Sequence, residues 1–314
     1  MKSLRKSVQE YLSLRRSLGF KLLEAGKGLL DFVTFMERHH ASYITSALAL
    51  DWAQQPTGVL PAHWAQRLSF VRGFARHHSA TDQRTEIPPF GLLPFRSKRA
   101  RPYLYSDGEI RSLLRAALDM PCRYQFGKLR PWTYHCLFGL LSVSGLRLGE
   151  ARNLELQDVD LKMALLTIRD SKFGKSRLVP LHASTCEVLA DYIARRERHW
   201  EGRPVSSYLF VSSQGNRLDG GDIHRTFYAL SQQIGLRSIS DNHGPRLHNM
   251  RHRLATNTLV TWYRSNQDPE RLLPILSAYL GHVHVEDTQW YLSNSPELMR
   301  EAMGRLEHRW EDRS

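Results

Sequence analysis

The chain has 314 residues, enough for two domains, and its 41% hydrophobic and 24% charged residues are ordinary for a globular protein. Its charge is not ordinary, because 44 Lys and Arg stand against 31 Asp and Glu, a net charge of +13. Such an excess favours a polyanionic partner, with nucleic acid ahead of an anionic membrane surface.

No apolar run approaches the roughly 20 residues of a membrane span. Residues 1–20 carry charges throughout, where a signal peptide would have an apolar core. The cysteines are Cys122, Cys136 and Cys186, an odd number without paired spacing, so neither a disulfide framework nor a zinc ribbon is predicted. We therefore expect an intracellular protein with no membrane partner.

Residues 1–83 are predicted to form a helical domain. Apolar residues recur at helical spacing in four stretches, with Gly19 and Pro56 among the residues that separate them. The fourth stretch carries Arg67 and Arg72 between its apolar residues. The domain is either a DNA-binding bundle, with these arginines as candidate contacts, or a generic bundle whose charges only solvate its surface.

Residues 84–102 are predicted to form a linker between domains. Proline and glycine interrupt the helical period at Pro88, Pro89, Gly91, Pro94 and Pro102. Positive charge gathers at Arg96, Lys98, Arg99 and Arg101. These cations either follow a phosphate backbone, which makes them candidate DNA contacts, or form a general polybasic tract.

Residues 103–314 are predicted to form a second, mainly helical domain with a small β-hairpin, an α+β arrangement. Ser106 and Glu109 have the spacing of a capping box ahead of an apolar helix, and a buried helix follows near 132–141. Further elements are expected as strands at 164–169 and 177–181 around a glycine-containing turn, helices at 183–200 and 219–234, a strand at 208–211, a loop at 236–247, and a last helix after Pro296.

The stretch from His248 to Tyr291 carries side chains suited to phosphodiester chemistry. His248 and Arg251 are three apart and so lie on one face of a helix. A guanidinium stays charged and matches a phosphate bidentately. A phenol has a pKa of about 10 and needs help to attack phosphorus. The phosphotyrosine that it would form conserves the energy of the broken bond for rejoining.

Each of these residues alone has an ordinary structural interpretation, as a surface cation, a packed histidine or a core tyrosine. A metal site is the other alternative, because His248 and His252 are four apart, as in zinc metalloproteases, and His282 and His284 are available. The glutamate that should follow the first histidine is replaced by Asn249. We therefore predict no metal.

Four segments together resemble the active-site motifs of the tyrosine recombinases, the phage-integrase family. They are Gly145-Leu146-Arg147-Leu148-Gly149-Glu150, the hairpin containing Lys172, His248-Asn249-Met250-Arg251, and Leu280-Gly281-His282 followed by Tyr291. The resemblance implies that Arg147 and Arg251 bind the phosphate and that Glu150 supports them. It implies that Lys172 protonates the leaving oxygen, with Lys175 as its competitor for that role and otherwise a DNA contact.

The same resemblance assigns the three remaining catalytic residues. His248 would be a proton acceptor or phosphate donor, His282 a further hydrogen-bond donor to the phosphate, and Tyr291 the nucleophile. It also implies a fold in which a helical core-binding domain and a catalytic domain form a C-shaped clamp on double-stranded DNA. No cofactor is expected.

The implied function is site-specific DNA recombination through a 3′-phosphotyrosine intermediate and a Holliday junction. A dimer would bind each site and a tetramer would form the synapse, with accessory recombinases as further partners, in the nucleoid of the cytoplasm. The last helix would dock either on a neighbouring protomer or on its own. Two alternatives stay open: relaxation of DNA in the manner of a type IB topoisomerase, and a catalytically silent DNA-binding architectural protein.

Overall fold

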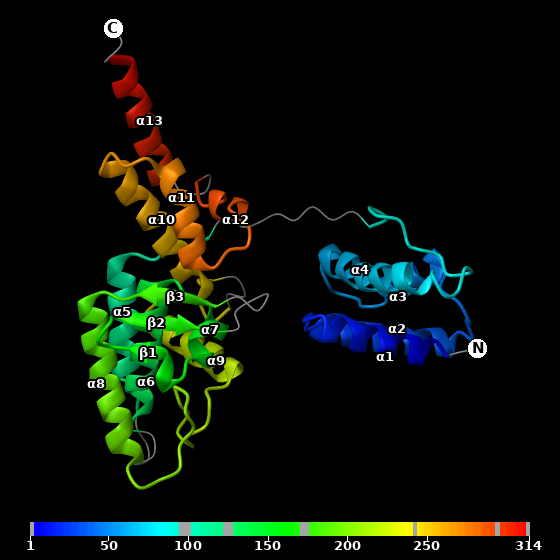
Figure 1. The fold of residues 1–314 in the computed structure, drawn as a ribbon, viewed down its shortest axis with the longest axis horizontal. Coiled ribbons are helices and arrows are strands. Elements are labelled where there is room, and N and C mark those ends of the chain that lie inside the picture. The colour runs from blue at the N-terminus through cyan, green and yellow to red at the C-terminus, as the bar shows by residue number, and fades with distance from the viewer. Residues whose placement is uncertain are drawn as a thin grey trace. The chain divides into compact units, whose positions relative to one another are not determined.

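The computed structural model describes residues 3–93, 102–121, 128–169, 176–240, 244–292 and 296–311 (Figure 1). The chain divides into two compact units, residues 1–100 and 101–314. Most of the described residues are helical, and one three-stranded antiparallel sheet accompanies the helices. The predicted fold class, mainly α with a small β-sheet, is confirmed. Among these residues no helix is long and apolar enough to cross a membrane.

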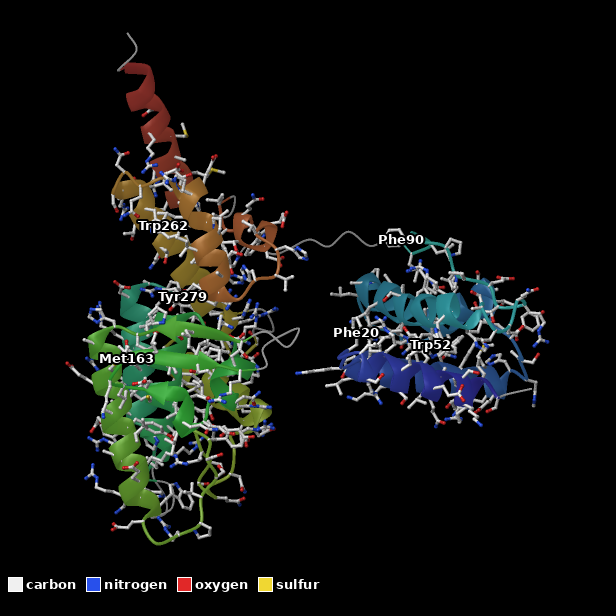
Figure 2. All side chains as sticks on the ribbon, viewed as in Figure 1. Phe20, Trp52, Phe90, Met163, Trp262 and Tyr279 are labelled. Atoms are coloured by element: carbon white, nitrogen blue, oxygen red, sulfur yellow. The ribbon has the colours of Figure 1, made fainter. Side chains whose placement is uncertain are left out.

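The first unit contains the four predicted helices. They are α1 (Leu4–Ser17), α2 (Leu23–Arg38), α3 (Ser46–Gln54) and α4 (Pro61–His78). The side chains of Ser3 and Thr45 cap α1 and α3 by accepting backbone N–H groups of the first turn. Trp52 is fully buried among the helices, whereas Phe90 lies on the outside with 93% of its surface exposed (Figure 2).

The first half of the predicted linker packs on this helical unit. The N–H of Glu86 donates to the carbonyl of Ile44, and Leu93 contacts the core of the bundle. Arg72 donates to the carbonyls of Pro88 and Pro89 at 2.8 and 2.9 Å. Residues 84–93 are therefore attached to the helices before them.

The second unit is built on α6, whose sides are nearly all covered. Its elements are α5 (Asp107–Leu118), α6 (Arg130–Ser144), α7 (Leu148–Asn153), a 3-10 turn (Leu156–Asp158), β1 (Val159–Asp160), β2 (Leu165–Ile168), β3 (Arg177–Pro180), α8 (Ala183–Trp200), α9 (Gly220–Gln233), α10 (His248–Arg264), α11 (Pro269–Leu280), α12 (Glu286–Gln289) and α13 (Pro296–Glu311). The capping box of Ser106 and Glu109 is present at the start of α5, as predicted. α6 carries Leu137 and Phe138 in the centre of the main core.

The sheet has the order β1-β2-β3, and Leu166 pairs with Val179. The two predicted hairpin strands are confirmed as β2 and β3, whereas β1 was not predicted. The strand predicted at 208–211 is wrong, because this segment makes only isolated bridges. Its carbonyls accept hydrogen bonds from side chains. Arg196 donates to the carbonyl of Tyr208, and the Tyr192 hydroxyl donates to the carbonyl of Leu209.

Candidate active site

The first part of the site is the turn between α6 and α7. α6 ends at Ser144 and is followed by Gly145, which has a φ of +61°, and a Cβ there would lie 2.6 Å from Cδ2 of Leu254. The turn places Arg147 at the start of α7. Its backbone N–H donates to Oε2 of Glu150 at 2.9 Å, and its Nη1 donates to Oε1 at 2.8 Å. Glu150 thus fixes both the main chain and the side chain of Arg147.

A second arginine binds the same carboxylate. Arg177, the first residue of β3, donates from Nη1 and Nη2 to the two oxygens of Glu150 at 3.0 and 2.8 Å. The Glu150 side chain is only 6% exposed. Burial works to raise its pKa, but the hydrogen bonds from Arg177 and Arg147 outweigh burial and lower the pKa to about 2.

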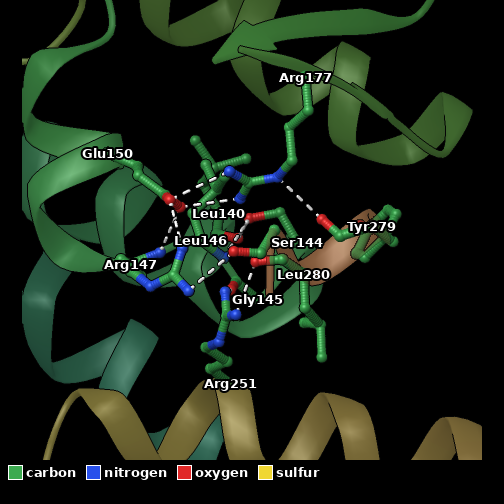
Figure 3. A network of polar contacts seen from close by, with 11 residues as sticks. Leu140, Ser144, Gly145, Leu146, Arg147, Glu150, Arg177, Arg251, Tyr279 and Leu280 are labelled. Carbon is green, nitrogen blue, oxygen red and sulfur yellow. Dashed lines mark hydrogen bonds and ion pairs between the residues drawn. The ribbon is translucent and has the colours of Figure 1, made fainter. Parts of the chain in front are cut away.

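The C-terminal end of α11 forms the opposite wall, and three arginines bind its last carbonyls (Figure 3). Arg177 donates to Tyr279, Arg251 to Leu280 and Arg147 to Gly281, at 2.9, 2.6 and 3.0 Å. The last carbonyls of a helix lack partners within the helix and carry its negative partial charge. Three cations are therefore held together by one carboxylate and one helix end.

Arg251 is the most deeply buried of the three, with 2% of its surface exposed. Its Nη1 also donates to the carbonyl of Gly145 at 2.7 Å, so it joins the end of α6 to the end of α11. Burial, and after it the charge of Arg147, lower its pKa to about 10. Burying this positive charge costs free energy, and an incoming phosphate would neutralise the charge.

Histidine and tyrosine rings line the rest of the site. The rings of His282 and Tyr291 are nearly parallel, with centroids 6.2 Å apart, and Nδ1 of His282 lies 2.7 Å from Oγ1 of Thr288. His252 contacts both Tyr291 and His248, at centroid distances of 5.4 and 4.7 Å. Tyr291 itself is 3% exposed. The predicted nucleophile therefore lies within a continuous group of rings.

Burial and nearby cations favour the neutral forms of His248 and His282. Burial first, and then the charges of Arg251 and Arg147, lower the pKa of His248 and lower that of His282 to about 4. Neutral imidazoles can donate or accept one hydrogen bond at each nitrogen. The site therefore combines permanent cations for a phosphate with neutral groups that can exchange protons.

Acidification is expected to destabilise the protein through His282. Its pKa is about 4 in the folded chain against an ordinary 6.5, so between these values the unfolded chain binds more protons. The free energy of unfolding should fall as pH drops through this window. Urea unfolding measured at about pH 7 and about pH 5 should show that the free energy of unfolding falls less in His282→Gln than in the unsubstituted protein. An equal fall in both proteins would contradict the assignment.

The structure brings together five of the six predicted catalytic residues: Arg147, His248, Arg251, His282 and Tyr291, with Glu150 beside them. Lys172 lies outside the described residues, as do Lys175, Arg96, Lys98, Arg99 and Arg101. The roles of all these residues stay predictions. No group of three or more His, Cys, Asp or Glu in the described ranges is placed to hold a metal.

The two arginines predicted to bind DNA in the helical unit have partners within it. Arg67 donates to the carbonyl of Trp52 at 3.0 Å and to Asp31, and its guanidinium lies 3.8 Å from the centroid of the Trp52 ring. Arg72 donates to the two proline carbonyls named above. Both arginines have structural partners here, and their contact with DNA stays a prediction.

Sequence reasoning missed Arg177 and the position of His252. Arg177 follows a turn and begins a strand, where an arginine is ordinarily a solvated residue. His252 is four residues from His248, a spacing that in the sequence alone is also that of a zinc-binding pair. The signal available for His252 was helical spacing, which puts it on the face of α10 that carries His248. No comparable signal marked Arg177, whose partners lie 27 and 102 positions away.

Comparison with known proteins shows the family of this chain. The phage integrase family matches residues 108–297. The chain is 68% identical over its full length to y4rB of Sinorhizobium fredii, named as an integrase/recombinase, and covers all of that protein. It is 29% identical, over 72% of its length, to tyrosine recombinase XerC of Pseudomonas entomophila, of which it covers 68%.

Among solved structures, the Tn1549 transposon integrase in complex with transposon right end DNA has a TM-score of 0.67 at 14% identity. The likeness covers 98% of this chain and 99% of that one, and it shows a shared fold. The chain therefore belongs to the phage integrase family, the tyrosine recombinases, which cleave and rejoin DNA. The predicted family is confirmed.

Proposed function

We propose that this chain cleaves and rejoins double-stranded DNA at specific sites, with Tyr291 as nucleophile and without a metal or a cofactor. One observation carries the proposal: Arg147, His248, Arg251, His282 and Tyr291 meet in one place, although more than 100 positions separate Arg147 from the others, with a separation of 134 for its hydrogen bond to Gly281. Preorganised donors around a phosphate are the main requirement of phosphoryl transfer.

In the proposed step, Oη of Tyr291 attacks the phosphorus and loses its proton to a neighbouring base, for which His248 is the candidate. The bond from phosphorus to the 5′ oxygen breaks, and the 3′ phosphate remains esterified to the tyrosine. Lys172 gives the leaving 5′ oxygen its proton. Attack by a 5′ hydroxyl on the phosphotyrosine reverses the step and rejoins the strand without ATP.

The two phosphate-binding arginines retain the donors that this step needs. A guanidinium has five N–H donors. Arg251 uses two of them, for Gly145 and Leu280, and Arg147 uses two, for Glu150 and Gly281. Each arginine thus keeps three that have no partner among the described residues. The present hydrogen bonds fix the orientation of the forks and leave the phosphate-binding donors open.

Tyr291 must move to reach DNA, because it is almost fully buried. It packs with Ala255, Leu259 and Leu298 in the cluster that α10, α11 and α13 share. α13 lies on α10 of its own chain (Figure 1), where Arg264 pairs with Glu297 and Glu301 at 2.8 Å. We therefore propose that DNA binding displaces α12 and the residues directly after it, which include Tyr291, and that α13 packs on its own chain before DNA is bound.

The remaining organisation is proposed from the family. Residues 1–83 would be the core-binding domain, 84–102 a basic linker and 103–314 the catalytic domain, together closing around DNA as a clamp. Arg67, Arg72, Arg96, Lys98, Arg99, Arg101 and Lys175 are the proposed backbone contacts. Dimers on each site and a tetramer in the synapse, with accessory recombinases as further partners, would act in the nucleoid.

The proposal is tested by mapping DNA ends that the purified protein traps. The protein is incubated with genomic DNA of its host, the reaction is stopped with detergent, and the protein-linked fragments are sequenced. We expect recurrent ends between inverted repeats, with protein on the 3′ ends and free 5′ hydroxyls. Linked ends at random positions would favour a topoisomerase, and unlinked DNA would favour a silent DNA-binding protein.

A further inference from the structure

We propose that Arg177 is a positioning residue for the phosphate-binding arginines, acting through Glu150 and the end of α11. The inference rests on the proposed function, because it concerns the same phosphate. Arg177 would not touch the DNA. Its role would be to set the charge and the orientation of the groups that do.

The first support is the geometry of its contact with Glu150. Both Nη atoms of Arg177 donate to the two carboxylate oxygens, and the two side chains are 11% and 6% exposed. A buried, bidentate pair of this kind has one favoured geometry, and lysine cannot reproduce it. Glu150 in turn accepts from the backbone and the side chain of Arg147. A shift of Arg177 is therefore transmitted to Arg147 through a single carboxylate.

The second support is the contact with α11. Nε of Arg177 donates to the carbonyl of Tyr279, one residue before the carbonyl that Arg251 binds and two before the one that Arg147 binds. Gly281 leaves room for this contact: its φ is +68°, and a Cβ there would lie 2.8 Å from Nη1 of Arg177. Arg177 thus also fixes the segment that leads to His282.

The third support is the balance of charge. The network contains three arginines and one carboxylate among its described side chains, an excess of two positive charges (three minus one), and the carboxylate binds Arg147 and Arg177 but not Arg251. Without Arg177, Arg147 alone would balance the charge of Glu150. Less of the positive charge of Arg147 would then act on the phosphate. A buried carboxylate that loses one partner is also costly to keep. Arg177 therefore leaves Arg147 available to the phosphate.

Single-turnover adduct formation on a nicked suicide substrate carrying a mapped site tests this role. At saturating DNA, Arg177→Met should lower the rate by about 10- to 100-fold, because a misplacement of about 1 Å costs on this scale. The Kd for DNA should stay within about threefold, since backbone contacts elsewhere carry most of the affinity. Arg177→Lys, which keeps the charge and loses the fork, should fall between Arg177→Met and the unsubstituted protein.

Two further comparisons separate positioning from mere stability. In the Arg147→Ala background, Arg177→Met should add less than about twofold, because groups that act as one unit are not additive. Adding Glu150→Gln to Arg177→Met should recover part of the lost rate by removing the buried negative charge that Arg147 alone would have to balance. The matched control is Arg196→Met, which removes another buried arginine bound to carbonyls, those of Ser206 and Tyr208. It should lower the Tm while leaving the rate of the folded protein unchanged.

The outcomes distinguish the two proposals. An adduct that forms as fast with Arg177→Met as with the unsubstituted protein overturns the role of Arg177 alone. Independent losses from Arg147→Ala and Arg177→Met, which multiply in the double variant, overturn it as well. If Arg177→Met does not fold, Arg177→Lys replaces it, both in the comparison with the unsubstituted protein and in the double variant with Arg147→Ala. Absence of any adduct from the unsubstituted protein overturns the proposed function and this inference with it.

Discussion

Replacement of Tyr291 by phenylalanine should abolish the covalent protein–DNA adduct and leave DNA binding unchanged. The substitution removes one oxygen from a ring that packs against His282 and His252, so the surrounding packing is retained. No other group can supply the attacking oxygen if the assignment is correct. Adduct formation on a suicide substrate, and Kd by fluorescence anisotropy, measure the two effects separately.

The matched control is Tyr263→Phe. Tyr263 lies on α10 in the same half of the unit, where its ring is 4.8 Å from the guanidinium of Arg305. This variant should form the adduct at the unsubstituted rate. An adduct from Tyr291→Phe would show that another residue is the nucleophile.

Arg251→Ala should lower the rate of adduct formation by about 10²–10³, the effect of removing one preorganised donor group from a developing anion. The loss should persist at saturating DNA, because the interaction strengthens as the phosphate gains charge. Arg251→Lys should also lose most of the rate, since a single ammonium cannot bind Gly145, Leu280 and a phosphate in the geometry of a planar fork.

Stability has to be measured beside this rate, because Arg251 also joins α6 to α11. Its removal leaves two buried carbonyls unpaired, at roughly 1–3 kcal/mol each. The control is Arg253→Ala on the same helix, which removes hydrogen bonds to the carbonyl of Tyr105 and to Asp107. Arg253→Ala should lose stability but cleave normally. Normal cleavage by Arg251→Ala would remove Arg251 from the phosphate-binding site.

Local signals in the sequence predicted much of the fold. The capping box at Ser106, Gly19 after α1 and Pro296 at the first position of α13 all act within about one helical turn, so their effect is independent of tertiary contacts. The hairpin of β2 and β3 was likewise visible as two short apolar runs around a glycine-containing turn. Elements of this kind are predictable because the residues that determine them lie within or next to the element itself.

Predictions failed where distant side chains bind the backbone. Residues 208–211 have the composition of a strand and 209–211 are buried, but Arg196 and Tyr192 of α8 donate the hydrogen bonds to their carbonyls that a neighbouring strand would donate. β1 was missed because two residues carry no periodicity. Both outcomes depend on contacts that only the assembled unit creates.

The same distinction applies to the site. Motifs predicted Arg147, His248, Arg251, His282 and Tyr291, since each lies in a short segment of defined spacing. The binding of three arginines to the end of α11 was not predictable, because it joins positions up to 134 residues apart. Arg177 belongs to this second group, which explains why sequence reasoning left it without a role.

The most direct measurement is mass spectrometry of the trapped adduct after digestion with nuclease and trypsin. Trypsin should release residues 272–300, a peptide that holds Tyr279 as well as Tyr291. Fragmentation should place the nucleotide on Tyr291, linked through its 3′ phosphate. A nucleotide on Tyr279, on any other residue, or linked through a 5′ phosphate would contradict the mechanism proposed for this chain.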